Sequence, residues 1–198
     1  LLFGGFLFDF KQFLAFFLAL SAHEFSHAMV AYYLGDNTAA SQGRLTLNPL
    51  SHIDVFGTVL LPLFLILSGA GIVFGWAKPV PVNYFALRDR RWGPALVSVA
   101  GPAANFVFGV ISIISLNLVN NYTDLGYNNL LVQFLFVLII VNFVLMVFNL
   151  IPIPPLDGSK ILFAILPDSL NEFKYTLEKY GIIILFALLL FGSAFLNL

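Results

Sequence analysis

The residues best suited to chemistry are the histidines and the glutamate of His23-Glu24-Phe25-Ser26-His27. On an α-helix, histidines four residues apart lie on one face, one turn from each other. Two imidazoles in this arrangement can occupy two sites of a tetrahedral zinc. Glu24 is offset by one residue, so its carboxylate can approach a water molecule at the metal without being a ligand itself. The pattern therefore predicts a hydrolytic zinc site.

The segment that carries this motif is apolar enough to lie inside a membrane. Phe13 to Ala22 contains Ser21 as its single polar residue, and Ala28 to Leu34 contains nothing more polar than tyrosine. Histidine and glutamate inside hydrocarbon are costly, and they are usually functional. One alternative is that the two histidines are surface residues of a helix that only looks hydrophobic, and the apolar flanks argue against it. Another is that they satisfy hydrogen bonds within a helical bundle.

Composition places the chain in the class of all-α polytopic membrane proteins. Of its 198 residues, 60% are hydrophobic and only 10% are charged, whereas a soluble domain carries about 25% charged residues. The apolar runs are continuous rather than alternating, which favours helices over a barrel. The net charge is −1 and there is no basic tract, so nucleic acid is not a predicted partner. The absence of cysteine excludes disulfides, a thiol nucleophile and thiolate metal ligands.

We expect one membrane domain, residues 1–198, with about four spanning helices. The first span is long enough to cross a bilayer, because 25 residues rise roughly 36 Å. A short helix is expected to follow the third span, within the segment 149–166. The predicted spans are residues 10–34, 95–119, 130–150 and 180–196.

The region from residue 36 to residue 91 is predicted to add a short β-hairpin near the active site. Gly43–Leu47 alternates like a strand. Lys78–Asn83 is extended, because its two prolines disfavour helix. These segments could pin an unwound substrate by adding its chain to a strand edge, or they could form a plain connection.

The apolar run Val55–Trp76 is predicted to be a re-entrant hairpin that turns near Ser68–Gly71. Basic residues predict which loops are cytoplasmic, and they occur on both sides of this run: Arg44, Lys78, Arg88, Arg90 and Arg91. A full span is the alternative, but it would put the two halves of the site on opposite sides of the membrane. The same rule places the active site toward the cytoplasm.

A third ligand is needed, because a catalytic zinc has three protein ligands and one open position. Asp157 is the best candidate among the ten acidic residues. It follows a proline-rich break and begins a short helix, where free N–H groups favour an ionised carboxylate. The alternative is that Asp157 is an ordinary capping aspartate. In that case Asp54 or His52 would be the third ligand.

Three motifs together resemble the site-2 protease family of intramembrane zinc metalloproteases, in its compact form without a PDZ domain. They are His23–His27, Gly101-Pro102-x-x-Asn105, and the run from Asn149 to Asp157-Gly158. The resemblance implies one zinc per chain, held by His23, His27 and Asp157, with Glu24 as the catalytic acid and base. It also implies cleavage of transmembrane segments in membrane protein substrates.

Other polar residues have more than one interpretation. The resemblance implies that Asn105 and Asn149 help to hold the substrate or polarise its carbonyl group. For Asn105, a side chain that bridges two helices is an equal alternative, and Asn142 fits that bridging role better. His52 could line the cytoplasmic mouth of the site and contact the substrate, although a turn-stabilising role is favoured.

A rival function is a non-enzymatic membrane scaffold or transporter with a structural metal. A structural zinc usually has four protein ligands, whereas the sequence offers three good ones and an intact Glu24, which favours catalysis. The predicted partners are therefore the lipid bilayer and membrane proteins with transmembrane segments. The predicted location is the prokaryotic plasma membrane. The sequence leaves the substrate and the oligomeric state open.

Overall fold

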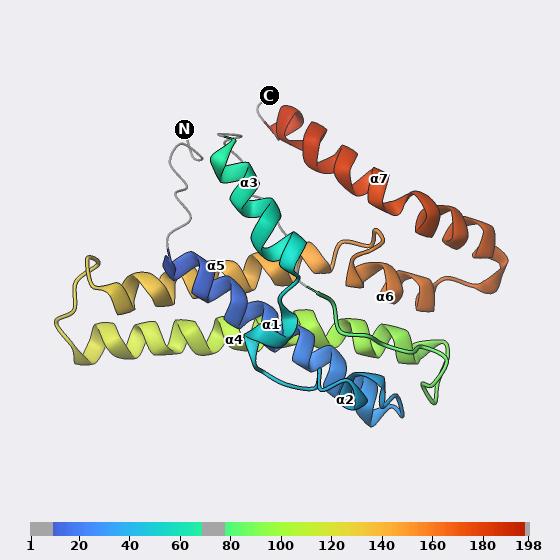
Figure 1. Ribbon diagram of the computed structural model, residues 1–198, viewed down its shortest axis with the longest axis horizontal. Coiled ribbons are helices and arrows are strands. Elements are labelled where there is room, and N and C mark those ends of the chain that lie inside the picture. The colour runs from blue at the N-terminus through green and yellow to red at the C-terminus, as the bar shows by residue number, and fades with distance from the viewer. Residues whose placement is uncertain (1–9, 69–77, 197–198) are drawn as a thin grey trace.

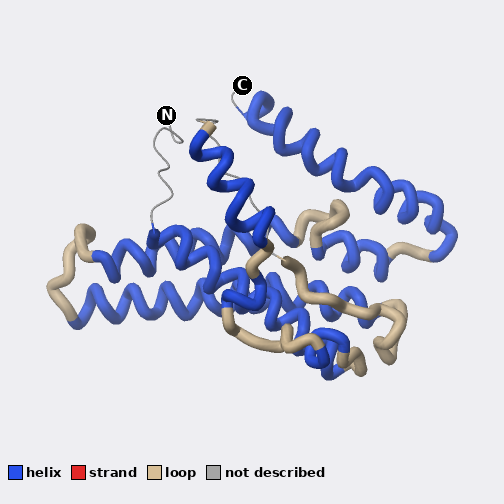
Figure 2. The backbone as a smooth tube through the Cα atoms, in the orientation of Figure 1, coloured by secondary structure: helices blue, strands red, loops and turns tan. Residues whose placement is uncertain are grey.

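The computed structural model describes residues 10–68 and 78–196. Every regular element within these residues is helical (Figure 2). The long helices are α1 (Phe10–Tyr33), α4 (Trp92–Tyr122), α5 (Leu130–Asn149) and α7 (Asn171–Leu196). The shorter ones are α2 (Thr38–Ser41), η1 (Pro49–His52), the π-helix η2 (Val55–Leu60), α3 (Leu61–Leu67), α6 (Asp157–Ile165) and η3 (Asp168–Leu170).

Three long helices form the centre of the fold. Helices α4 and α5 run side by side, and α1 crosses them and contacts both (Figure 1). Helix α6 packs against α4. This packing joins the helix that carries the histidine motif, the helix that carries Gly101-Pro102-x-x-Asn105 and the helix that begins with Asp157.

Helices α1, α4 and α5 are each long and apolar enough to cross a membrane, by length and composition. Continuous apolar runs favour helices there, because a helix satisfies its own backbone hydrogen bonds in lipid. The predicted helical fold is confirmed for the described residues, and the three long apolar helices are consistent with the predicted membrane protein. The fourth predicted span, residues 180–196, lies within α7, and its crossing of the membrane stays a prediction.

The boundaries differ most at α7 and α4. Helix α7 begins at Asn171, nine residues before the predicted span 180–196, so it includes the charged residues Glu172, Lys174, Glu178 and Lys179. Its first turns are fixed to the preceding segment, because Lys174 Nζ donates to the carbonyl oxygen of Leu166 at 2.9 Å. Helix α4 begins at Trp92, and the carboxylate of Asp89 accepts the backbone N–H groups of Arg91 and Trp92. These two bonds lower the pKa of Asp89.

The predicted β-hairpin is not confirmed, since residues 10–68 and 78–196 contain no strand. Three backbone donors of the 78–83 segment already have other partners, which leaves few for a strand ladder. The N–H groups of Lys78, Val80 and Asn83 donate to the His52 carbonyl, to Glu24 and to Asp36. The two prolines between them have no N–H to give. Arg44 instead joins the two segments through its guanidinium, which donates to the Lys78 carbonyl at 2.8 Å.

The first half of the predicted re-entrant run is helical. Its N-terminal end is capped by Asp54, whose carboxylate accepts the N–H of Gly57 at 2.7 Å. The chain continues through η2 and α3 as far as Leu67. The second half, residues 69–77, lies outside the described residues, so the predicted return to the same side of the membrane stays a prediction.

Candidate metal centre

Helix α1 places the histidine motif against the other spanning helices. His23, Glu24 and His27 are all buried, with exposed fractions of 3%, 9% and 8%. The Nε2 atoms of His23 and His27 lie 3.0 Å apart, as the four-residue spacing on a helix predicts. The two imidazoles therefore present their Nε2 atoms to one point between them.

Asp157 brings a carboxylate oxygen to the same point. Its Oδ2 atom lies 3.2 Å from Nε2 of His23 and 3.2 Å from Nε2 of His27. In a tetrahedral zinc site with bonds of about 2.0–2.1 Å, neighbouring ligand atoms are about 3.3 Å apart. The three atoms thus form one face of a tetrahedron of the size that zinc requires, and among the described residues they are the one group of this kind.

The outer nitrogens of both imidazoles are held by oxygen acceptors. Nδ1 of His23 lies 2.6 Å from Oδ1 of Asn105, and Nδ1 of His27 lies 2.7 Å from the carbonyl oxygen of Val97. An oxygen of this kind accepts hydrogen bonds, so each Nδ1 carries the proton and each Nε2 keeps its lone pair. This is the tautomer that a metal ligand needs, with the kind of outer partner that orients metal-binding histidines.

The carboxylate of Asp157 also fits a metal. Its Oδ2 atom is buried and has no hydrogen-bond donor of acceptable geometry, which is costly unless a cation compensates. Metal binding requires the carboxylate in its ionised form.

Gly101 leaves the space in which the imidazoles sit. A Cβ atom at this position would lie 2.5 Å from Cε1 of His23 and 2.5 Å from Nε2 of His27. Val97, Gly101 and Asn105 are spaced four residues apart, so they form one stripe along α4. Val97 offers its carbonyl oxygen to His27, Asn105 offers its amide oxygen to His23, and Gly101 leaves room for both rings. The role of Val97 was not predicted from the sequence.

Asp157 is the first residue of α6, as predicted, and Gly158 allows this helix to start close to the end of α5. A Cβ atom at Gly158 would collide with the carbonyl oxygens of Leu150 and Ile151. The helix start is therefore pressed against the chain that leaves α5. This contact holds the carboxylate in register with the histidines.

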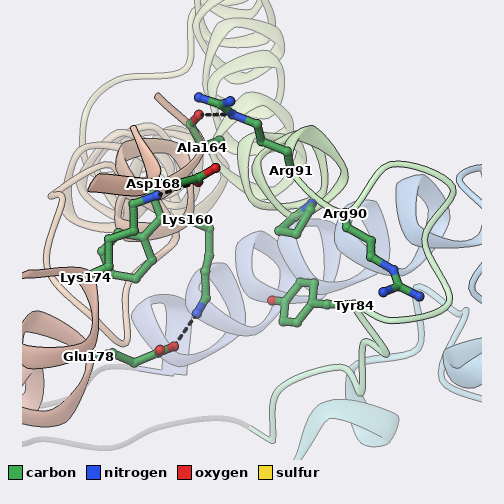
Figure 3. A pocket seen from close by; sticks show the side chains of 10 residues that line it. Tyr84, Arg90, Arg91, Lys160, Ala164, Asp168, Lys174 and Glu178 are labelled. Carbon is green, nitrogen blue, oxygen red and sulfur yellow. Dashed lines mark hydrogen bonds and ion pairs between the residues drawn. The ribbon is translucent and has the colours of Figure 1, made fainter. Parts of the chain in front are cut away.

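The other end of α6 is fixed by two cations (Figure 3). Arg91 Nε donates to the carbonyl oxygen of Ala164 at 3.1 Å, and Lys174 Nζ donates to that of Leu166. These bonds satisfy carbonyl groups that a helix leaves free at its C-terminus. Both cations line a cavity of about 440 Å³ between α6, α7 and the start of α4, where Lys160 also pairs with Glu178 at 2.8 Å. Both ends of α6 are thus anchored.

Glu24 is held by the extended segment that precedes α4. Its Oε2 atom accepts the backbone N–H of Val80 at 2.8 Å. Asp36 fixes the same segment, because its Oδ2 accepts the N–H of Asn83 at 2.7 Å. Asp36 follows Gly35, which ends α1 with a positive φ of 108°. The turn that ends the motif helix therefore also positions the backbone that orients Glu24.

The remaining predicted residues lie in different surroundings. Asn105 is fully buried, and its amide nitrogen donates to Ala19 and to Asn142. Asn149 donates to the carbonyl oxygen of Leu145 within its own helix. His52 is fully buried, and its Nε2 bonds the carbonyl oxygen of Thr46, which supports the turn-stabilising interpretation. Contact of any of the three with substrate stays a prediction.

Comparison with known proteins agrees with this geometry. Residues 123–192 match a family described as Peptidase family M50. "Putative zinc metalloprotease YwhC" of Bacillus subtilis is 40% identical over 174 residues, which cover 86% of this chain and 76% of that protein. "Putative zinc metalloprotease Rip2" of Mycolicibacterium smegmatis is 32% identical over 174 residues, which cover 87% of this chain and 64% of that protein. No solved structure matches the chain.

The fold and the site define a zinc metalloprotease in an integral membrane protein. The chain belongs to peptidase family M50, the site-2 protease family. The predicted family, enzyme class and cofactor are confirmed.

Proposed function

We propose that the chain is a zinc-dependent intramembrane endopeptidase, which hydrolyses peptide bonds within transmembrane segments of other membrane proteins. The convergence of Asp157 Oδ2 on the Nε2 atoms of His23 and His27, which lie in a helix long and apolar enough to cross a membrane, carries this proposal. At about 1.5 Å per residue, His23 lies roughly 15–20 Å from either end of α1. The site is therefore at a depth where the peptide bonds of a membrane-embedded segment would meet it.

Zinc, when bound by His23, His27 and Asp157, supplies Lewis acidity that activates water at neutral pH and polarises a carbonyl group. Glu24 is the proposed acid and base: its carboxylate takes the proton of the attacking water and later gives it to the leaving amine. The N–H of Val80 orients this carboxylate through Oε2. Glu24 can therefore transfer protons without coordinating the metal. This agrees with its offset of one residue from His23.

The proposed substrates are single membrane-spanning segments that unwind before cleavage, because an intact helix shields its peptide bonds. The described residues around Glu24 offer few free backbone donors for the unwound chain, since Val80 and Asn83 already donate to Glu24 and Asp36. The unwound chain is therefore proposed to be held by direct contact with the metal and Glu24 rather than by strand addition at this segment.

The proposed location is the plasma membrane, with the site open toward the cytoplasm. The support is the basic residues before α4 and along α6 and α7, including Arg91, Lys160 and Lys174, compared with the loop between α4 and α5, which has none. Cytoplasmic loops carry such an excess of basic residues.

Co-expression with tagged single-span membrane proteins tests the proposal. We expect the wild-type chain, and not Glu24→Gln, to release a fragment whose mass places the cut inside the apolar segment. Glu172→Gln changes an exposed glutamate of α7 in the same way and should leave cleavage intact. Fragments that end only outside the apolar segment would contradict intramembrane cleavage, and fragments that persist in Glu24→Gln would contradict the proposed chemistry.

A further inference from the structure

A chain of buried amides joins the three spanning helices at the metal centre. Asn105 on α4 and Asn142 on α5 are both fully buried, although asparagine inside a membrane bundle is costly unless its groups are paired. The Nδ2 of Asn105 donates to Oδ1 of Asn142 at 3.0 Å. The Oδ1 of Asn105 lies 2.6 Å from Nδ1 of His23 on α1. The two amides thus form a continuous path from α5 to a proposed metal ligand.

Backbone carbonyls fix the direction of each amide in this path. The Nδ2 of Asn142 donates to the carbonyl oxygen of Leu138 at 2.8 Å, so its Oδ1 must face Asn105. The Nδ2 of Asn105 also donates to the carbonyl oxygen of Ala19 at 3.0 Å, so its Oδ1 must face His23. A carbonyl oxygen accepts hydrogen bonds and never donates. Reversing either amide would therefore bring oxygen against oxygen or nitrogen against nitrogen.

The consequence reaches the imidazole of His23. Because an acceptor faces Nδ1, the proton resides there and the Nε2 lone pair points to the metal position. If Asn105 turned over, its amide nitrogen would favour the other tautomer, in which Nε2 carries the proton and cannot bind a metal. One of the two acceptors that prevent this reversal is Oδ1 of Asn142.

We propose that Asn142 is a positioning residue for the zinc site, which sets the tautomer and orientation of His23 through Asn105. The proposal rests on the assignment of His23 as a zinc ligand in the proposed function. Asn142 does not contact the metal position, and its influence passes through one hydrogen bond to Asn105. The sequence alone favoured a helix-bridging role for Asn142, and the bridge is the means by which it acts.

Zinc affinity of the purified full chain in detergent, measured by competition with a chelator, tests the proposal without any need for activity. Asn142→Leu keeps the branched shape of the side chain but removes its acceptor, and we expect about tenfold weaker zinc binding, as for other residues that orient metal ligands. Asn142→Asp keeps an oxygen toward Asn105, and it should bind zinc within about twofold of the wild type.

A double variant separates this mechanism from a general loss of packing. Asn105→Leu should weaken zinc binding by about 10- to 100-fold. If Asn142 acts through Asn105, adding Asn142→Leu to that variant should weaken zinc binding no further, because the path is already cut. Losses that multiply in the double variant would overturn the proposal, as would Asn142→Leu with wild-type zinc affinity.

Ser112→Ala provides a matched control for the removal of a buried polar group. Ser112 is buried on α4, and its hydroxyl donates to the carbonyl oxygen of Phe108 one turn back, as the Asn142 amide does to Leu138. This variant should keep wild-type zinc affinity, and an equal loss here would assign the effect of Asn142→Leu to packing and overturn the proposal. His23→Ala is measured in parallel: retained zinc in that variant would contradict the ligand assignment itself, a result distinct from failure of Asn142→Leu alone.

Discussion

Gly101 lies directly against the imidazole of His23, so that a single methyl group on Gly101 would be 2.5 Å from Cε1 of that ring. The optimal separation of carbon atoms in separate groups is about 3.5–4.0 Å. The glycine is therefore required by the neighbouring helix and not by its own backbone. It allows α4 to lie close enough to α1 for Asn105 and the Val97 carbonyl to reach the two histidines.

Gly101→Ala should reduce zinc binding strongly, because the added Cβ displaces both imidazoles from the positions that converge with Asp157. We expect zinc content of the purified protein, measured by atomic absorption, to fall well below one per chain. Gly109→Ala on the same helix is the control: the atoms nearest to its Cβ would belong to the ring of Phe143, at 2.9 Å from Cε2, and that side chain can move. Full zinc occupancy in Gly101→Ala would show that the histidines do not depend on this gap.

Asp157→Ala should lower zinc content as His23→Ala and His27→Ala do, because each change removes one of three ligand atoms. Asp168→Ala removes an exposed carboxylate in the segment after α6 and should leave zinc content unchanged. If Asp157→Ala kept both zinc and activity, the third ligand would have to be Asp54 or His52. The burial of His52 and its bond to Thr46 speak against that assignment.

Glu24→Gln should separate zinc binding from catalysis. The amide keeps the size of the side chain and an oxygen for the N–H of Val80, but it cannot accept the proton of the attacking water. We expect zinc content equal to that of the wild type and a cleavage rate lower by about 10²- to 10⁴-fold, the usual range for a general base. Loss of zinc in this variant would make Glu24 a ligand instead.

Arg91→Gln should lower the stability of the protein, because the carbonyl oxygen of Ala164 loses its donor at the end of α6. One such hydrogen bond contributes about 1 kcal/mol, which corresponds to a fall in Tm of roughly 2–4 °C for a chain of this size. The neighbouring change Arg90→Gln is the control, and Figure 3 shows the guanidinium of Arg90 pointing away from Ala164. Equal shifts in the two variants would attribute the effect to charge alone.

Cysteine labelling can test the proposed topology, because the chain has no native cysteine. Single cysteines at Ser51, Asn83 and Asn121 would be treated in intact cells with a thiol reagent that does not cross the membrane. We expect labelling at position 121 only, because it lies in the last turn of α4, next to a loop that lacks the basic residues that favour the cytoplasm. Labelling at position 83 but not at position 51 would show that the run between them crosses the membrane.

The sequence alone determined the class of fold and the chemical groups of the site. Long apolar runs must become helices in a membrane, because each backbone group has to be satisfied within its own segment. The four-residue spacing of His23 and His27 then fixes their common face without any tertiary information. Asp157 was also predictable, because a proline-rich break followed by Asp-Gly is typical of a helix start. The predicted strand at the 78–83 segment is not confirmed. Extended backbone forms a β-strand only when its N–H and C=O groups bond to a neighbouring strand.

Only the tertiary structure decided what faces the histidines and Glu24. Helical periodicity tells which side of α1 is buried, but it does not tell which atoms of α4 or of the 78–83 segment meet that side. The bonds from His23 to Asn105, from His27 to Val97 and from Val80 to Glu24 join residues 82, 70 and 56 positions apart. Two of the partners, the carbonyl oxygen of Val97 and the N–H of Val80, are backbone groups. Because nearly every residue has such groups, the residue type does not predict these contacts. The backbone groups that reach the site are determined by how the helices cross and how far apart they lie. Packing at residues such as Gly101 sets this crossing and this separation.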